Sequence, residues 1–100
     1  MSKAYWVAQV TVTEPVAYAR YAEAASEAFR KYGGRILSRA GRVIALEGEF
    51  RARNVAIEFP NIEAALGCYN SDEYQQAKSH RLDAGDVSLI ILEGVEEVAP

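Results

Sequence analysis

The side chains best suited to chemistry lie in the middle of the chain, where two acids alternate with several arginines. Arg39 and Arg42 precede Glu47, and Arg53 precedes Glu58. Paired carboxylates beside arginines can hold and polarise a small oxygenated molecule. The same residue types also form ion-pair networks between strands or subunits. Before geometry is known the two arrangements look alike, and the ion-pair network is the more frequent one.

Two polar residues interrupt segments that otherwise predict strands. Gln9 lies within an apolar strand pattern, and Glu58 lies between Ile57 and Phe59, where a bare charge needs a partner. Either side chain could face the interior of a barrel or a cleft between helices and sheet. Glu58 is therefore a candidate catalytic residue. The candidate ligand-binding residues are Gln9, Arg39, Arg42, Glu47 and Arg53.

His80 is the single histidine and a second catalytic candidate. A general base or a haem ligand requires such a side chain, but no partner spacing supports either role. The plainer interpretation is a loop histidine that caps the preceding helix or faces solvent. Cys68 is the single cysteine and has no basic neighbour, so an inert buried thiol is expected. We expect neither a metal site nor a cofactor, because no His–Cys–carboxylate cluster is visible.

Most of the aromatic residues recur at helical spacing. Together with Trp6, they could line an aromatic pocket between helix and sheet: Tyr18, Tyr21, Tyr32, Tyr69 and Tyr74. Tyrosines with this spacing are more often core residues whose hydroxyl groups find partners at the edge of the core.

Composition bounds the function classes. The 100 residues make one domain, and half of them are hydrophobic. Residues 30–53 carry seven basic and two acidic side chains, a local charge of +5 within a net charge of −3. Such a segment can attract a small anion or an acidic partner, but the chain is too acidic for a nucleic-acid binder. No apolar run reaches membrane-span length and no signal peptide is visible, so a cytoplasmic protein is the expectation.

The elements that must position these residues follow from periodicity and turn signals. We predict strands over 4–13, 54–59 and 86–93, a helix over 15–31, shorter helices over 61–69 and 71–79, and a tail over 96–100. Residues 35–47 predict one strand with a bulge at Ala40-Gly41, and a tight hairpin there is the alternative. Gly33-Gly34 should end the long helix, with one glycine in the left-handed conformation.

This order is β-α-β-β-α-β, which predicts an α+β, ferredoxin-like fold with two helical segments on one face of a four-stranded antiparallel sheet. The first and last strands are expected in the middle of the sheet. The helix-free face would then carry Tyr5, Val7, Ile90 and Leu92, which are too apolar for open water. A sheet-to-sheet homodimer is therefore predicted.

Several segments carry a resemblance to a known family, notably Lys31-Tyr32-Gly33-Gly34-Arg35, Leu46-Glu47-Gly48, Ile57-Glu58-Phe59-Pro60 and Tyr69-Asn70-Ser71. The chain resembles the domain-of-unknown-function 1330 (DUF1330) family, within the dimeric α+β barrel superfamily. The resemblance implies one domain over residues 1–95 and a barrel built from two sheets. It implies no activity, since relatives in the superfamily include cofactor-free monooxygenases, isomerases, dehydratases and haem enzymes.

Two functional hypotheses follow. The first is a cofactor-free enzyme or binder that holds a small organic metabolite in a helix–sheet cleft. The alternative is a non-catalytic homodimeric module that binds a ligand or a protein through the basic segment 35–53. The sequence leaves open whether the protein is a catalyst.

Overall fold

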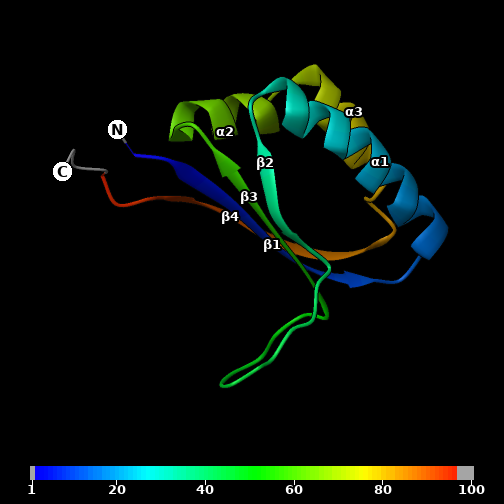
Figure 1. The fold of residues 1–100 in the computed structure, drawn as a ribbon. Coiled ribbons are helices and arrows are strands. Elements are labelled where there is room, and N and C mark those ends of the chain that lie inside the picture. The colour runs from blue at the N-terminus through cyan, green and yellow to red at the C-terminus, as the bar shows by residue number, and fades with distance from the viewer. Residues whose placement is uncertain (1, 97–100) are drawn as a thin grey trace.

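Three helices cover one face of a curved four-stranded antiparallel sheet in the computed structural model, which describes residues 2–96 (Figure 1). The elements in chain order are β1 (Ala4–Val12), α1 (Pro15–Lys31), β2 (Arg35–Arg39), β3 (Arg53–Phe59), α2 (Ile62–Tyr69), α3 (Asp72–Ser79) and β4 (Gly85–Glu93). The predicted ferredoxin-like α+β fold is confirmed, with the second helical segment split in two. All but the first residue of the predicted tail lies outside the described residues.

The strand order is β2-β3-β1-β4, so β1 and β3 are the central strands. The expectation that the last strand is central is wrong. β4 pairs only with β1 and forms an edge of the sheet. β4 is apolar on both of its faces. Leu89 and Ile91 pack against the core, whereas Ile90 and Leu92 are about half exposed on the helix-free face.

Helix α1 begins and ends as predicted. Pro15 occupies its first turn, and the residues buried on its inner face include Tyr18, Tyr21 and Phe29. Gly33 follows the helix with φ 82°, the left-handed conformation that glycine adopts without strain. The backbone of α1 approaches α3 more closely than it approaches the sheet. Large side chains therefore fill the space between α1 and the sheet.

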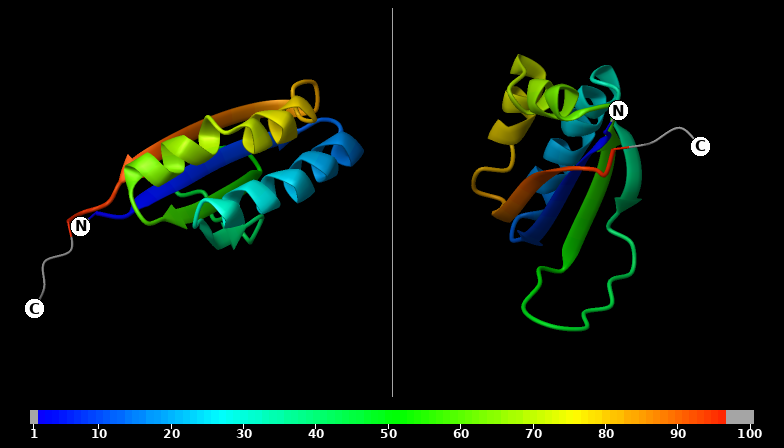
Figure 2. Two further views of the ribbon diagram at one scale, coloured as in Figure 1. Left: turned by 90° about the horizontal axis from the view of Figure 1, so that it is seen from above. Right: turned by 90° about the vertical axis from the view of Figure 1, so that its left-hand side faces the viewer.

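Residues 40–52 form a long exposed loop instead of the predicted strand continuation. β2 ends at Arg39, and Ala40 turns the chain with φ 55°. The irregularity in the β2–β3 ladder lies between Ile36 and Ser38, so neither the bulge nor the hairpin predicted at Ala40-Gly41 is correct. The Ala40 amide still donates to the Asn54 carbonyl of β3 at 2.9 Å, and β3 begins one residue before Asn54, so the chain beyond Ala40 leaves the sheet. The loop projects on the side of the sheet opposite the helices (Figures 1 and 2).

Side-chain caps start the two short helices, which lie where the sequence predicts them. The Asn61 side chain accepts a hydrogen bond from the Ala64 amide at 2.7 Å, and the Ser71 hydroxyl accepts one from the Tyr74 amide at 3.1 Å. Tyr74 is thereby fixed over the sheet, where its ring meets the edge of Trp6 at 4.9 Å between centroids. No helix within residues 2–96 is long and apolar enough to cross a membrane.

Candidate functional site

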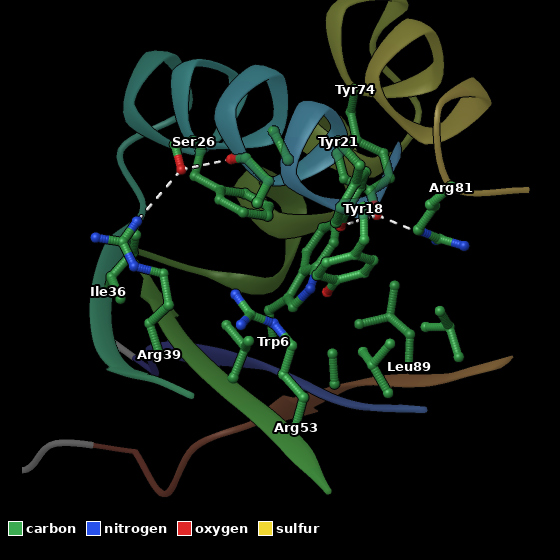
Figure 3. A pocket seen from close by; sticks show the side chains of 17 residues that line it. Trp6, Tyr18, Tyr21, Ser26, Ile36, Arg39, Arg53, Tyr74, Arg81 and Leu89 are labelled. Atoms are coloured by element: carbon green, nitrogen blue, oxygen red, sulfur yellow. Dashed lines mark hydrogen bonds between the residues drawn. The ribbon is translucent and has the colours of Figure 1, made fainter. Parts of the chain in front are cut away.

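A narrow cleft with a volume of about 30 Å³ lies between α1 and the sheet, and it adjoins an open hollow at Tyr18, Ala22 and Arg53. Its floor and back are apolar and come mainly from β1, β4 and the inner face of α1: Trp6, Ala8, Val10, Ala25, Phe29, Val87 and Leu89. Its polar groups come from α1, β2, β3 and α3 and the residues after it: Tyr18, Tyr21, Ser26, Arg39, Arg53, Tyr74 and Arg81. Arg39 and Arg81 lie toward opposite ends, with Arg53 between them (Figure 3).

Two tyrosines and an arginine form a buried cluster at one end of the cleft. The hydroxyl oxygens of Tyr21 and Tyr74 lie 2.9 Å apart, and Nη2 of Arg81 donates to Tyr74 Oη at 3.3 Å. The Arg81 guanidinium also lies 5.1 Å from the centre of the Tyr21 ring. Arg81 is only 9% exposed, and its Nε–H has no hydrogen-bond partner among the described residues.

The ionisation of this cluster follows from its burial. Burial and the adjoining Tyr74 hydroxyl raise the pKa of Tyr21 far above its usual range, so Tyr21 stays protonated. Burial alone would lower the pKa of Arg81, but the hydroxyl groups of Tyr74 and Tyr21 accept from the guanidinium and hold its pKa above the usual value. The cluster therefore presents protonated donors.

Arg53 lies in the middle of the cleft, on β3. Its guanidinium carbon is 5.0 Å from the centre of the Tyr18 ring, a cation–π contact. The Arg53 Nε–H is buried and has no hydrogen-bond partner among the described residues. Buried polar groups are normally hydrogen-bonded, so an unpaired donor in a cleft wall indicates a place for an acceptor.

Arg39 and Ser26 mark the mouth beside β2. Nη1 of Arg39 donates to the Ser26 hydroxyl at 3.4 Å, and that hydroxyl donates to the Ala22 carbonyl at 2.8 Å. The Arg39 side chain is exposed, so this long bond holds it only loosely.

The cleft is strongly positive. Three arginines line it, and no Asp, Glu or His does. None of the ion pairs between described residues involves Arg39, Arg53 or Arg81. The described residues also contain no group of three His, Cys, Asp or Glu side chains placed to hold a metal ion.

A family model for a domain of unknown function, DUF1330, matches residues 3–95. The chain belongs to the DUF1330 family. No curated protein matches it in sequence.

Solved structures that resemble this DUF1330 chain share its fold at low sequence identity. A protein of unknown function from Rhodopseudomonas palustris is 22% identical, with a TM-score of 0.73 over 96% of this chain and 85% of that one. A dimeric ferredoxin-like protein of unknown function from Bacteroides fragilis is 13% identical, with a TM-score of 0.63 over 91% and 95%. SnoaB, a cofactor-independent oxygenase from Streptomyces nogalater, is 8% identical, with a TM-score of 0.69 over 100% and 99%. At these identities the likeness shows the fold alone.

Of the residues predicted to form a site, the DUF1330 fold brings Arg39 and Arg53 into the cleft. Gln9 and Glu58 lie on the opposite, helix-free face, because they alternate with the buried residues of β1 and β3. Glu58 accepts from Lys3 Nζ at 2.8 Å, and this hydrogen bond lowers the pKa of the Glu58 carboxyl. The partner that the sequence analysis expected for the Glu58 charge is thus Lys3, which directly precedes β1.

The remaining predicted residues lie away from the cleft. Arg42 and Glu47 are exposed in the 40–52 loop, and His80 is the exposed C-cap of α3. The basic segment 35–53 is divided as well, since Arg35 lies on the helix-free face and Arg51 reaches Thr11 and Ser88 on that face at 3.3 and 3.4 Å. The charges of this segment therefore form no single surface.

Sequence reasoning did not single out Arg81 or Ser26. A signal for Arg81 was present, because Tyr74 and Arg81 are seven residues apart and so lie on one side of a helix and its terminal turn. Ser26 gave no signal, since a serine on an amphipathic helix is ordinary. The aromatic pocket predicted as the lesser alternative exists in part: Tyr18, Tyr21 and Tyr74 are core residues that also line the cleft.

Proposed function

We propose that this DUF1330 protein binds a small organic molecule in the helix–sheet cleft. The observation that carries the proposal is the buried, unpaired Nε–H of Arg53, set in a cleft whose floor and back are apolar. Ligand sites typically combine apolar walls with a few convergent polar groups. A buried donor without a partner costs free energy, which a bound acceptor would recover.

The same groups suit a reaction that uses protein side chains alone. Tyr21, Tyr74 and Arg81 can donate hydrogen bonds to an oxygen atom that gains negative charge, such as the oxygen of an enolate. Tyr21 stays protonated, so it would act as a donor or an acid and not as a base. The structural likeness to a cofactor-independent oxygenase supports such chemistry at the level of fold only.

The experiment that tests the binding site is calorimetry with small aromatic compounds on the wild-type protein and on a variant with a filled cleft. Ala22 lines the cleft, so Ala22→Phe should abolish binding. Val16→Phe is the matched control, since Val16 is exposed on the same helix and lines neither this cleft nor the hollow beside it. Equal binding by both variants would contradict the proposal.

The helix-free face is, on this proposal, covered by a second copy of the chain. Ile90 and Leu92 are 54% and 50% exposed there, and the 40–52 loop extends on the same side with exposed Ile44, Leu46 and Phe50 (Figure 2). A similar structure from Bacteroides fragilis is dimeric. Burial of such a surface between two sheets would supply the apolar contact that a stable homodimer needs.

A further inference from the structure

We infer that the ligand class of the cleft is a small organic acid, whose carboxylate is held by Arg53 and whose apolar body lies against the floor of the cleft. This inference rests on the proposed function and adds the charge and shape of the ligand.

Charge is the first argument. The cleft wall contains three guanidinium groups and no carboxylate, and no described acid forms an ion pair with any of them. A buried charge without a counter-ion is strongly unfavourable unless hydrogen bonds or an opposite charge compensate it. Arg81 has partial compensation from Tyr74 and Tyr21. Arg53 is only half-buried, but its Nε–H is buried, and among the described residues its guanidinium contacts the Tyr18 ring.

Hydrogen-bond polarity is the second argument. Arg81 can only donate, so Tyr74 accepts from it. If Tyr74 in turn donates to Tyr21, the Tyr21 hydroxyl hydrogen is left to point at the ligand. Arg53 adds a buried Nε–H and the amino group beside it, the fork that matches the two oxygens of a carboxylate. The charged groups of the cleft are all donors and its hydroxyl groups can also donate, which favours a ligand rich in acceptors.

Shape is the third argument. Trp6, Val10, Phe29 and Leu89 form apolar walls around the polar groups, so the remainder of the ligand must be apolar. The cation–π contact with Tyr18 holds the Arg53 guanidinium at the wall of a narrow cleft. A carboxylate attached to a small apolar group satisfies both features, and because the cleft volume is about 30 Å³, a ring the size of that of benzoate extends into the adjoining hollow at Tyr18, Ala22 and Arg53. Inorganic phosphate would leave the apolar walls uncovered.

The test is calorimetric titration of the full-length protein with benzoate, its neutral analogue benzamide, and inorganic phosphate. We expect benzoate to bind about 10- to 100-fold more tightly than benzamide, the range expected for hydrogen bonds to a charged group. Arg53→Met should remove this preference, and Arg53→Lys should restore part of it. Arg35→Met is the matched control, because Arg35 is exposed on the opposite face and should leave binding unchanged.

The outcomes separate this inference from the proposed function. Benzamide binding as tightly as benzoate, with loss on Ala22→Phe, would overturn the ligand class and leave the cleft as the site. Phosphate binding as tightly as benzoate would also overturn the class. The ligand class and the assignment of the cleft as the site would both be overturned by either of two results. One is benzoate binding that persists in Arg53→Met and in Ala22→Phe, and the other is no binding by any aromatic probe. Circular dichroism of each variant verifies that a lost signal reflects the cleft and not unfolding.

Discussion

The hydroxyl oxygens of Tyr21 and Tyr74 lie 2.9 Å apart although 53 residues separate them in the chain. This bond joins α1 to α3 at the buried end of the cleft, so the groups that would contact a ligand also hold two helices together. Tyr74 is fully buried and Tyr21 is 8% exposed, which makes the pair sensitive to removal of either hydroxyl.

Removal of one hydroxyl from this pair should destabilise the fold. Tyr21→Phe and Tyr74→Phe should each lower the free energy of unfolding by about 1–2 kcal/mol, because the remaining hydroxyl loses its buried partner. The double variant should lose less than the sum of the two, since the second substitution removes an already unpaired group. Urea unfolding measures all three, with Tyr5→Phe on the helix-free face as the control. Strictly additive losses would contradict the coupling.

Stability should also fall at alkaline pH because of Tyr21. Its pKa is raised in the folded state, while in the unfolded chain it ionises near its ordinary value of about 10. The unfolded state therefore releases this proton first as the pH rises, and the contribution of Tyr21, complete below about pH 10, declines by about 1.4 kcal/mol per pH unit above it. The stability difference between the wild type and Tyr21→Phe should narrow over that range. A constant difference would contradict the assigned shift.

Cys68 should be unreactive in the folded protein. Its side chain is fully buried, and burial raises the pKa of the thiol to about 11, so little thiolate is present at neutral pH. A thiol reagent such as Ellman's reagent should react slowly in buffer and fast in urea. Rapid reaction of the native protein at the rate of an exposed thiol would show that the packing around Cys68 is wrong.

Glu58 should be dispensable for binding in the cleft. It lies on the helix-free face and pairs with Lys3, which lowers the pKa of its carboxyl. The stability from this pair is present above the ordinary pKa of glutamate and is lost as the pH falls. Glu58→Gln should leave benzoate affinity unchanged while Arg53→Met reduces it. A loss with Glu58→Gln as large as that with Arg53→Met would move the site to the other face of the sheet.

If the proposed homodimer forms through the helix-free face, a charge placed on that face should separate the subunits. Light scattering after size exclusion should give twice 11.0 kDa for the wild type and 11.0 kDa for Ile90→Lys. Val16→Lys is the control, because Val16 is 72% exposed on α1 and far from that face. A monomeric wild type would contradict the dimer.

The elements were predictable where local chemistry decides them. Pro15 and Gly33 bracket α1, and Asn61 and Ser71 start α2 and α3, because each satisfies a helix end through its own neighbours. Strand order and the 40–52 loop were not predictable in this way. The apolar pattern of residues 42–46 resembles a strand, but a strand requires a partner, and β3 begins only at Arg53.

The candidate site was predictable only in part, because period two assigns residues to faces but does not say which face carries the cleft. Gln9 and Glu58 share the helix-free face, whereas Arg53 and Arg39 face the helices. Arg81 joins the site through contacts with Tyr74 and Tyr21, which are tertiary contacts. The family resemblance predicted the fold, but it assigned no role to any residue.

The most direct test of the central claim, that the helix–sheet cleft is the ligand site, is nuclear magnetic resonance of the Arg53 Nε–H group. That signal can be assigned by its loss in Arg53→Lys, and its buried, unpaired state makes it sensitive to an arriving acceptor. Titration with benzoate should shift the Arg53 signal while the backbone amides of Gln9 and Glu58 stay in place. A stationary Arg53 signal with shifts at Gln9 and Glu58 would contradict the account.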